Sequence, residues 1–237
     1  TNRKTHSQDQ SQDAAYQQLQ KRIAPELGQI TWQTGIIDAG VRTLSDRQFV
    51  AVDICGDDRL AISLLTILLA SGVSQATLAL SNVQRNIAAD DLGTGVFTIS
   101  DLDTNLTNRI CEIARDFALF PISKIPTTTK YLTIIFGAPD PAKINTLLIS
   151  NLPHLFISAL DATTLRVGPL VIPGKSPCFR CIELNQLEQS PLLNQINQAR
   201  SFAQPQLLNI AATAQVAGMI AQSVLNYLDT GFSELIG

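Results

Sequence analysis

Residue types that often carry catalysis are scarce in this chain of 237 residues, which contains two His, four Cys, one Met and one Trp. A Ser/His or Cys/His nucleophile needs a His base, but His6 lies in a polar N-terminal segment and His154 precedes an apolar stretch. The sequence therefore argues against this kind of nucleophilic catalysis. Four Cys are too few and too widely spaced for a disulfide framework, so a cytoplasmic location is expected.

Charge and long apolar runs are also limited. Only 16% of the residues are charged and the net charge is -3, which argues against a nucleic-acid-binding surface. The longest apolar stretch, residues 64–70, is far shorter than the ~20 residues that cross a bilayer. No nucleic-acid partner and no membrane association are therefore expected, whereas 45% hydrophobic residues supply ample material for a buried core.

Three segments are predicted along the chain. Residues 1–13 are polar and rich in Gln and Ser, which predicts a disordered lead-in. Residues 14–48 are expected to form an N-terminal helix followed by an extended arm over 29–38, with Trp32 either in the core or at a dimer contact. Residues 49–237 are expected to form a single α/β domain.

The start of that domain has the pattern of a βαβ unit. Residues 49–55 form an apolar run rich in β-branched side chains, a turn begins at Gly56, residues 60–71 favour a helix, and residues 76–80 form a second apolar run. Further apolar strands are predicted over 131–136 and 155–160. The expected fold is α/β, with a Rossmann-like, mostly parallel sheet flanked by helices.

A Cys-x-x-Cys pair, Cys178 and Cys181, follows another apolar strand and a Pro-Gly turn. Two thiols at this spacing can bind a metal from one side or form a redox disulfide. No Cys follows Cys181, and neither His lies nearby in the sequence. Since structural zinc needs four ligands, an incomplete zinc site or a reversible dithiol is expected.

Taken together, these patterns resemble the ThiF/MoeB superfamily, the ubiquitin-activating-enzyme-like adenylyltransferases. The resemblance lies in the glycine turn of residues 54–61, in Ala-Ser-Gly-Val at 70–73, and in Pro-Cys-Phe-Arg-Cys at 177–181. It extends from about residue 49 to the C-terminus and is greatest to actinobacterial ThiF-like proteins, some of which bind leader peptides in thiazole/oxazole peptide maturation. It implies a homodimer that uses ATP and Mg²⁺ to adenylate the C-terminal carboxylate of a peptide or ubiquitin-like substrate.

The resemblance also implies roles for individual residues. Gly56, Asp58 and Asn82 occupy cofactor-binding positions, and Cys178 and Cys181 occupy metal-binding positions. The positions that would stabilise charge during adenylation are occupied by Arg59, Arg85 and Asp140. Asp140 has an alternative explanation as the N-cap of a helix that begins at Pro141.

This sequence departs from the superfamily's pattern in the glycine turn. Asp58 replaces a Gly that lets the backbone approach a phosphate, and Asp57 adds a second carboxylate beside it. Leu80 stands where an acidic residue would bind the ribose hydroxyls. These residues argue against ATP binding in the usual mode.

Three functions remain open. The first is a ThiF-like domain, degenerate in nucleotide binding, that serves as a scaffold for a peptide or small carrier protein, in modified-peptide or sulfur-carrier chemistry. The second is an active ATP- and Mg²⁺-dependent adenylyltransferase. The third is a generic NAD-binding Rossmann enzyme, which Asp58 and Leu80 disfavour. A homodimer is expected, with the Ala- and Gly-rich helix face of residues 211–218 either at the dimer contact or packed on the chain's own sheet.

Overall fold

The computed structural model describes residues 2–37, 39–80, 82–119, 130–137, 140–159, 164–189 and 208–236, with side chains described from residue 17 onward. Residues 2–13, which the sequence predicts to be a disordered lead-in, lie in this range as backbone only, and their backbone is the first part of a helix that begins at Asn2. Within the described residues, no helix combines the length and apolar character needed to cross a bilayer.

The centre of the molecule is a five-stranded sheet with the strand order β2-β1-β3-β4-β5. The strands are β1 (Val50–Cys55), β2 (Gln75–Ala79), β3 (Lys130–Phe136), β4 (His154–Ala159) and β5 (Leu165–Val171). The first four run parallel, and β5 pairs with β4 in the antiparallel direction. The predicted mostly parallel α/β sheet is confirmed. The chain passes from β1 outward to β2 and then returns to β3, so a topological switch point lies between β1 and β3.

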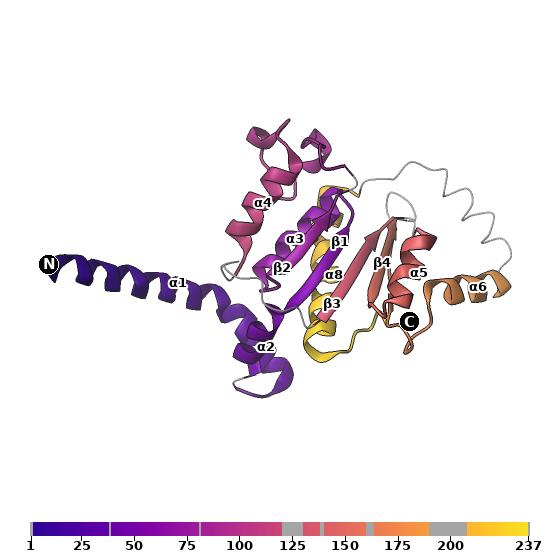
Figure 1. Cartoon of the computed structure of the whole chain (residues 1–237), viewed down its shortest axis with the longest axis horizontal. Coiled ribbons are helices and arrows are strands. Elements are labelled where there is room, and N and C mark those ends of the chain that lie inside the picture. Colours follow the sequence, from indigo (N-terminus) through magenta and orange to yellow (C-terminus); the bar gives the residue numbers. More distant parts are fainter. Residues whose placement is uncertain are drawn as a thin grey trace.

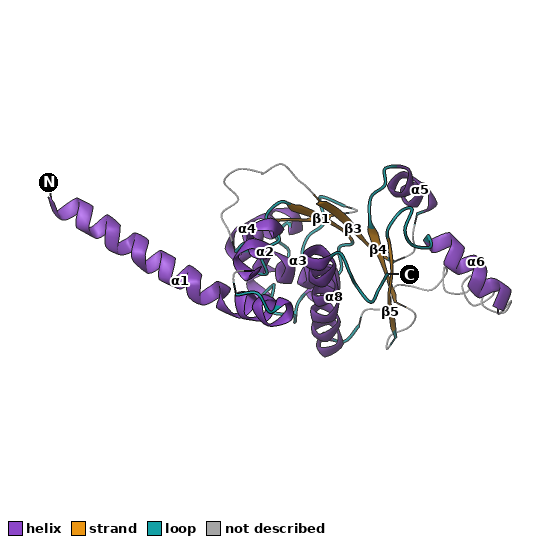
Figure 2. Ribbon diagram, turned by 90° about the horizontal axis from the view of Figure 1, so that it is seen from below, coloured by secondary structure: helices purple, strands orange, loops and turns teal. Residues whose placement is uncertain are grey.

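Helices cover both faces of this sheet (Figures 1 and 2). Helices α3 (Arg59–Ala70) and α8 (Ile210–Thr230) lie on one face, and α5 (Pro141–Ile149) lies on the other. Helix α4 (Leu106–Phe117) packs beside α3, and two short 3₁₀ turns, η1 (Ala89–Asp91) and η2 (Ile99–Asp101), precede it. Helix α6 (Phe179–Gln189) follows β5. Helix α4 therefore lies on the α3 side of the sheet.

Alternation along the strands divides the interior into two cores. Ile134 on β3 and Leu155 on β4 face the large core beneath α3 and α8, where Leu64 and Leu68 are fully buried. Their sequence neighbours Ile135 and Phe156 point to the opposite face and pack with Leu147 of α5 and with Val171; we call this set the α5 core. Because successive strand residues face opposite sides, β3 and β4 are apolar on both.

The N-terminal part of the chain is helical where an arm was predicted. Helix α1 (Asn2–Thr34) continues through residues 29–34, and α2 (Ala39–Arg47) follows a short turn. The prediction of an extended arm is therefore wrong for 29–34. The apolar spacing of Ile23, Leu27 and Ile30 continues along one helix face, and Ile30 is buried against Leu44. The predicted boundaries at residues 13 and 48 stay predictions.

Trp32 lies on the opposite side of α1. Its side chain is 89% exposed, so the core position suggested for it by the sequence is wrong in this chain. The beginning of α1 extends away from the sheet, whereas its end packs against α2 (Figure 1). The alternative role of Trp32, a dimer contact, stays a prediction.

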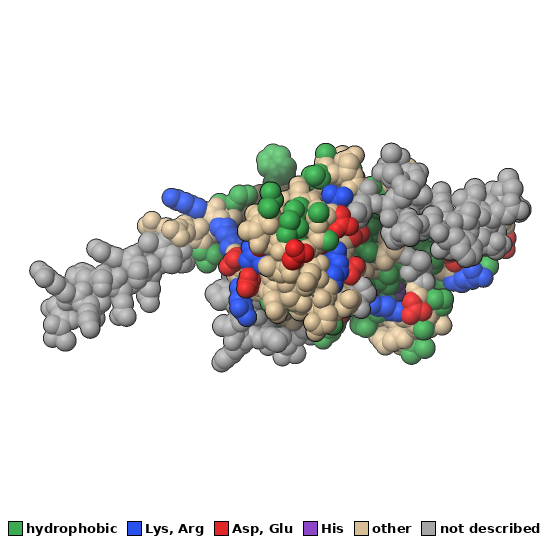
Figure 3. Space-filling model, turned by 90° about the horizontal axis from the view of Figure 1, so that it is seen from above, with side chains coloured by type: hydrophobic (Ala, Val, Ile, Leu, Met, Phe, Trp, Pro, Cys, Tyr) green, Lys and Arg blue, Asp and Glu red, His purple; other side chains and the backbone are tan. Residues whose placement is uncertain are grey.

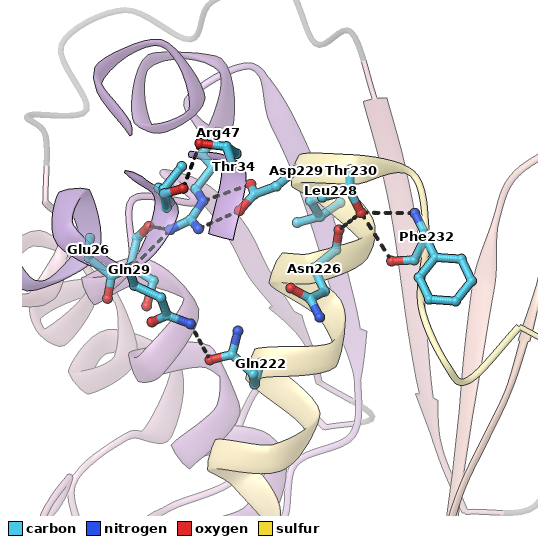
Figure 4. A network of polar contacts seen from close by, with 12 residues as sticks. Glu26, Gln29, Thr34, Arg47, Gln222, Asn226, Leu228, Asp229, Thr230 and Phe232 are labelled. Atoms are coloured by element: carbon cyan, nitrogen blue, oxygen red, sulfur yellow. Dashed lines mark hydrogen bonds and ion pairs between the residues drawn. The ribbon is translucent and has the colours of Figure 1, made fainter. Parts of the chain in front are cut away.

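One buried arginine joins the N-terminal helices to the rest of the fold (Figure 4). Arg47, at the end of α2, is only 4% exposed. Its guanidinium donates to both carboxylate oxygens of Asp229 on α8, at 3.0 and 2.6 Å, and to Glu26 on α1 at 3.0 Å. A fourth bond, of 2.7 Å, goes to the carbonyl oxygen of Ser71 at the end of α3. Burial by itself would lower the pKa of Arg47, but the bonds and charges of Asp229 and Glu26 outweigh it and raise that pKa.

The surface charges are mixed in sign. On the face shown in Figure 3, most of the coloured Lys and Arg side chains lie beside Asp or Glu side chains. That face shows no continuous basic patch among the described residues, and such a patch is what a protein that neutralises phosphates would present.

Candidate functional site

The carboxyl ends of β1, β2 and β3 meet at one edge of the sheet, where open α/β folds bind ligands. Cys55, the last residue of β1, pairs with Ala79 of β2 on one side and with Ile135 of β3 on the other. The glycine turn follows β1 directly, and the segments that carry Asn82 and Asp140 follow β2 and β3. The topology thus places six of the predicted site residues at this edge.

Gly56 is explained by packing against β3. A Cβ at this position would lie 2.9 Å from the Cβ of Phe136, closer than real Cβ contacts allow. Phe136 therefore leaves no space for a side chain at position 56. The glycine that the superfamily uses at this turn has a steric reason in this chain that is independent of any phosphate.

Asp58 occupies the N-terminus of α3. Its backbone is extended (φ −83°, ψ 169°) and its carboxylate accepts a 2.8 Å hydrogen bond from the backbone N–H of Ala61. Burial raises the pKa of Asp58, although the N–H groups of Ala61 and Leu60 act in the opposite direction. Free N–H groups at a helix N-terminus are what binds a phosphate. Here the protein's own carboxylate uses them.

Arg85 closes over the same turn. It donates to the carbonyl oxygen of Asp57 at 2.9 Å and to the carboxylate of Asp91 at 2.7 Å. Asp91 is buried, and its other oxygen accepts from the N–H of Ala88 at 2.9 Å. Arg85 therefore has two protein partners and fastens the segment after β2 onto the glycine turn. Of the predicted site residues, Arg85 is brought together with Asp58.

Arg59, the first residue of α3, is the predicted cation with unused hydrogen-bonding capacity. Its Nε is buried and has no hydrogen-bond partner among the described residues. The backbone carbonyl oxygen of Arg59 accepts from Ser63 within the helix at 2.7 Å.

Asn82 and Asp140 make local bonds instead of converging on the turn. The Asn82 side chain accepts from the N–H of Gln84 at 2.9 Å and is exposed. Asp140 accepts from the N–H of Ala142 at 3.0 Å, with Pro141 at the first helical position. The N-cap explanation for Asp140 is confirmed, and its role near a metal stays a prediction.

The cap predicts a measurable stability effect. Asp140→Ala should lower the free energy of unfolding by about 1 kcal/mol, because the N–H of Ala142 loses its acceptor. Asp140→Asn should change it by less than ~0.5 kcal/mol, since Asn caps helices as well as Asp does. Urea denaturation of both variants checks this. Equal losses in the two variants would show that the carboxylate's charge, and not its capping bond, stabilises the fold.

Leu80 is partly buried and packs against the hydrophobic core. It follows β2 immediately and contacts the large core beneath α3 and α8. An apolar side chain cannot accept hydrogen bonds from ribose hydroxyls. The position that the resemblance assigns to an acidic residue therefore contributes to stability in this chain.

Lys143 was not anticipated from the sequence. It lies on α5, and its ammonium donates to the Cys55 thiol at 2.8 Å, across 88 positions in the chain. No local motif marks this pair, so only the fold could reveal it. It places a cation beside the carboxyl end of β1.

The two cysteines of the Cys-x-x-Cys motif lie together at the start of α6. Their Sγ atoms are 3.1 Å apart, and the backbone N–H of Cys181 points to Cys178 Sγ at 3.4 Å. The hydrogen bond between the thiols lowers the pKa of Cys178 and raises that of Cys181. Among the described residues, no third His, Cys, Asp or Glu joins them in a group that could hold a metal.

A hollow of about 290 Å³ lies at the opposite edge of the sheet, near the amino ends of β1 and β3. It is lined in part by Val50, Lys130, Arg47 and Asp229. This hollow therefore borders the ion pair between Arg47 and Asp229. It does not coincide with the turn at Gly56.

Comparison with solved structures identifies the same architecture. Over 83% of this chain and 60% of the other, it superposes on E. coli MccB solved with AMPCPP and MccA, with a TM-score of 0.60 and 18% identity. The match to E. coli MccB solved with ATP has the same values. PaaA matches over 92% of this chain and 77% of its own, with a TM-score of 0.63 and 14% identity.

The fold is similar to that of MccB. The identity is low, so the likeness concerns the fold, and this chain spans 60% of the length of the MccB chain in both of these structures. No protein-family model matches the sequence, and no curated protein matches it.

Proposed function

We propose that this chain is a ThiF-like domain that has lost the usual nucleotide site and acts as a scaffold for a peptide or small carrier protein. The observation that carries the proposal is the bond between the Asp58 carboxylate and the N–H of Ala61. It fills the N-terminus of α3 with a negative charge, where a nucleotide phosphate would otherwise be stabilised.

Two further features support the loss of nucleotide binding. Arg85 is already bonded to Asp91 and to the Asp57 carbonyl, so it would have to give up these partners to reach a phosphate. Leu80 packs in the core and supplies no acceptor for a ribose. The peptide partner is proposed from the fold, since MccB has been solved with MccA. Free thiols at all four Cys support a cytoplasmic location.

An active adenylyltransferase is the second candidate, and Arg59 is the observation that favours it. Its Nε is buried at the start of α3 and has no hydrogen-bond partner among the described residues, and E. coli MccB has been solved with ATP. In that case ATP with Mg²⁺ would supply the adenylyl group. Arg59 and Arg85 would then stabilise its phosphates.

Peptide binding with and without nucleotide separates the two candidates. The probes are synthetic peptides that correspond to short open reading frames beside the gene, labelled for fluorescence anisotropy. A scaffold binds one of them equally well with and without Mg²⁺-ATP and releases no pyrophosphate. Pyrophosphate release that depends on the peptide would establish the adenylyltransferase instead.

We also propose that the chain forms a homodimer through α8. Some small residues of this helix face the core and others face solvent: Ala217 is fully buried where α8 packs against α3, whereas Ala214 is exposed. The larger Met219 is also 62% exposed. The exposed side is free to pack against a second copy. Trp32 offers the next candidate contact.

Light scattering should therefore give twice the single-chain mass of 25.6 kDa. Ala214→Glu places a charge on the exposed side of α8 and should reduce the mass to the single-chain value. As a control, Ile149→Glu on α5, where the side chain is 85% exposed, should leave the dimer intact. A wild-type protein that is monomeric at micromolar concentration would contradict the proposal.

A further inference from the structure

The cysteine pair at the start of α6 has no part in the proposed function. Cys178 is half-buried and packs against the α5 core beside Phe179, while Cys181 is exposed in the first turn of the helix. Their sulfur atoms lie 3.1 Å apart. A disulfide bond requires about 2.05 Å, so a shift of roughly 1 Å would join them.

The described part of the chain offers these thiols few metal ligands. Cys55 is engaged by Lys143 at the end of β1, and Cys111 is exposed on α4. His154 is fully buried, and its Nδ1 is within 2.9 Å of the Leu152 carbonyl oxygen. In the part of the chain that the structure describes, no group of three or more potential ligands forms. Two thiolates alone do not complete a tetrahedral zinc site.

We propose that Cys178 and Cys181 are a reversible dithiol that exchanges with small-molecule disulfides such as oxidised glutathione. One cysteine thiolate attacks a sulfur of the oxidant, whose S–S bond breaks, and one glutathione leaves with the electron pair. The second cysteine then attacks the mixed disulfide and displaces the second glutathione. The protein loses two electrons and two protons, and two molecules of reduced glutathione are formed.

The bond has a defined structural consequence. Cys178 is held by the α5 core, which also contains Phe156 and Val171. Cys181 belongs to α6, and its N–H already points to Cys178. Oxidation therefore ties the first turn of α6 to that core, and reduction releases it.

Mass spectrometry of the full chain tests the proposal. All proteins carry Cys111→Ser, because exposed Cys111 would itself react with glutathione. After reduction and treatment with oxidised glutathione, this reference protein should lose the mass of two hydrogen atoms, and digestion should yield a peptide linked between Cys178 and Cys181. Dithiothreitol should restore the original mass.

Single variants supply the matched comparison. Cys178→Ser and Cys181→Ser each lack a second thiol, so each should stop at the mixed disulfide and gain the mass of one glutathione less two hydrogen atoms. Cys55→Ser should behave as the reference does. The proposal is overturned if the reference protein also stops at the mixed disulfide. It is equally overturned if purified protein holds one zinc per chain that shields both thiols from maleimide.

Discussion

Arg47→Met is expected to lower the free energy of unfolding by about 3–5 kcal/mol, the usual cost of removing one member of a buried ion pair. Arg47 is 4% exposed and bonds to Asp229, Glu26 and the Ser71 carbonyl oxygen. Its loss would leave the Asp229 carboxylate, whose side chain is only 12% exposed, without its cation. Met fills much of the same volume, so the cost reflects charge and hydrogen bonding more than a cavity.

The chain contains a matched control for this experiment. Arg42 lies on the same helix and pairs with Asp46, but the side chains are 88% and 70% exposed and the closest atoms are 4.0 Å apart. Arg42→Met should change stability by less than about 0.5 kcal/mol. Urea denaturation followed by circular dichroism measures both variants. If the two variants lose equal stability, Arg47 does not join the four helices in the way the structure indicates.

A double variant tests the reason for the loss. Asp229→Asn removes the carboxylate that Arg47→Met leaves unpaired. The double variant should therefore be less destabilised than the sum of the two single variants, because the penalty for an uncompensated buried charge is counted only once. Strict additivity would contradict the view that Arg47 and Asp229 act as a pair.

Asp58→Asn is expected to strengthen Mg²⁺-ATP binding by at least about tenfold, which corresponds to about 1.4 kcal/mol. Two like unit charges about 4 Å apart repel each other by roughly 4 kcal/mol near a protein surface. Removal of the Asp58 carboxylate beside a phosphate can therefore account for a tenfold gain in affinity. The Asn side chain keeps the bond to the N–H of Ala61, so α3 keeps its cap. Displacement of a fluorescent ATP analogue measures the change.

Two comparisons isolate the cause of that gain. Asp58→Gly removes both the charge and the side chain, and it should bind ATP at least as well as Asp58→Asn if crowding also matters. Asp140→Asn removes a carboxylate at the same edge of the sheet, but its side chain caps α5 and is exposed. It should leave ATP affinity within about twofold, since exposed charges are screened by solvent. An equal gain in Asp140→Asn would attribute the effect to net charge.

The central part of the fold could be predicted from local patterns. The apolar run over 49–55 and the helix over 60–71 correspond to β1 (Val50–Cys55) and α3 (Arg59–Ala70) within one residue at every end. Short-range signals sufficed here because each element is apolar, bounded by turn residues and joined to the next by a short loop. The antiparallel pairing of β5 with β4 carries no local signal and was not predicted.

The N-terminal helices were harder to predict because their contacts are distant in the sequence. Residues 29–34 look extended in isolation, yet Ile30 is buried against Leu44 as part of a helix face. The bond between Arg47 and Asp229 spans 182 positions. Neither the residue types nor their spacing predicts that Arg47 bonds to Asp229, since Arg and Asp are ordinarily surface residues.

The candidate site was partly predictable. The position of Asp58 in the glycine turn already indicated a conflict with phosphate, and the N-cap of Asp140 followed from its place before Pro141. The contact of Lys143 with Cys55 depends on how α5 crosses the sheet, so it could not be inferred from the sequence. The reason for Gly56, its approach to Phe136, likewise depends on the pairing of β1 with β3.

Titration calorimetry of the wild-type protein with Mg²⁺-ATP tests the central claim most directly. The Asp58 carboxylate at the N-terminus of α3 and the apolar Leu80 together predict no saturable binding in the micromolar range. A micromolar dissociation constant, equivalent to about -8 kcal/mol, would contradict the account and favour the adenylyltransferase.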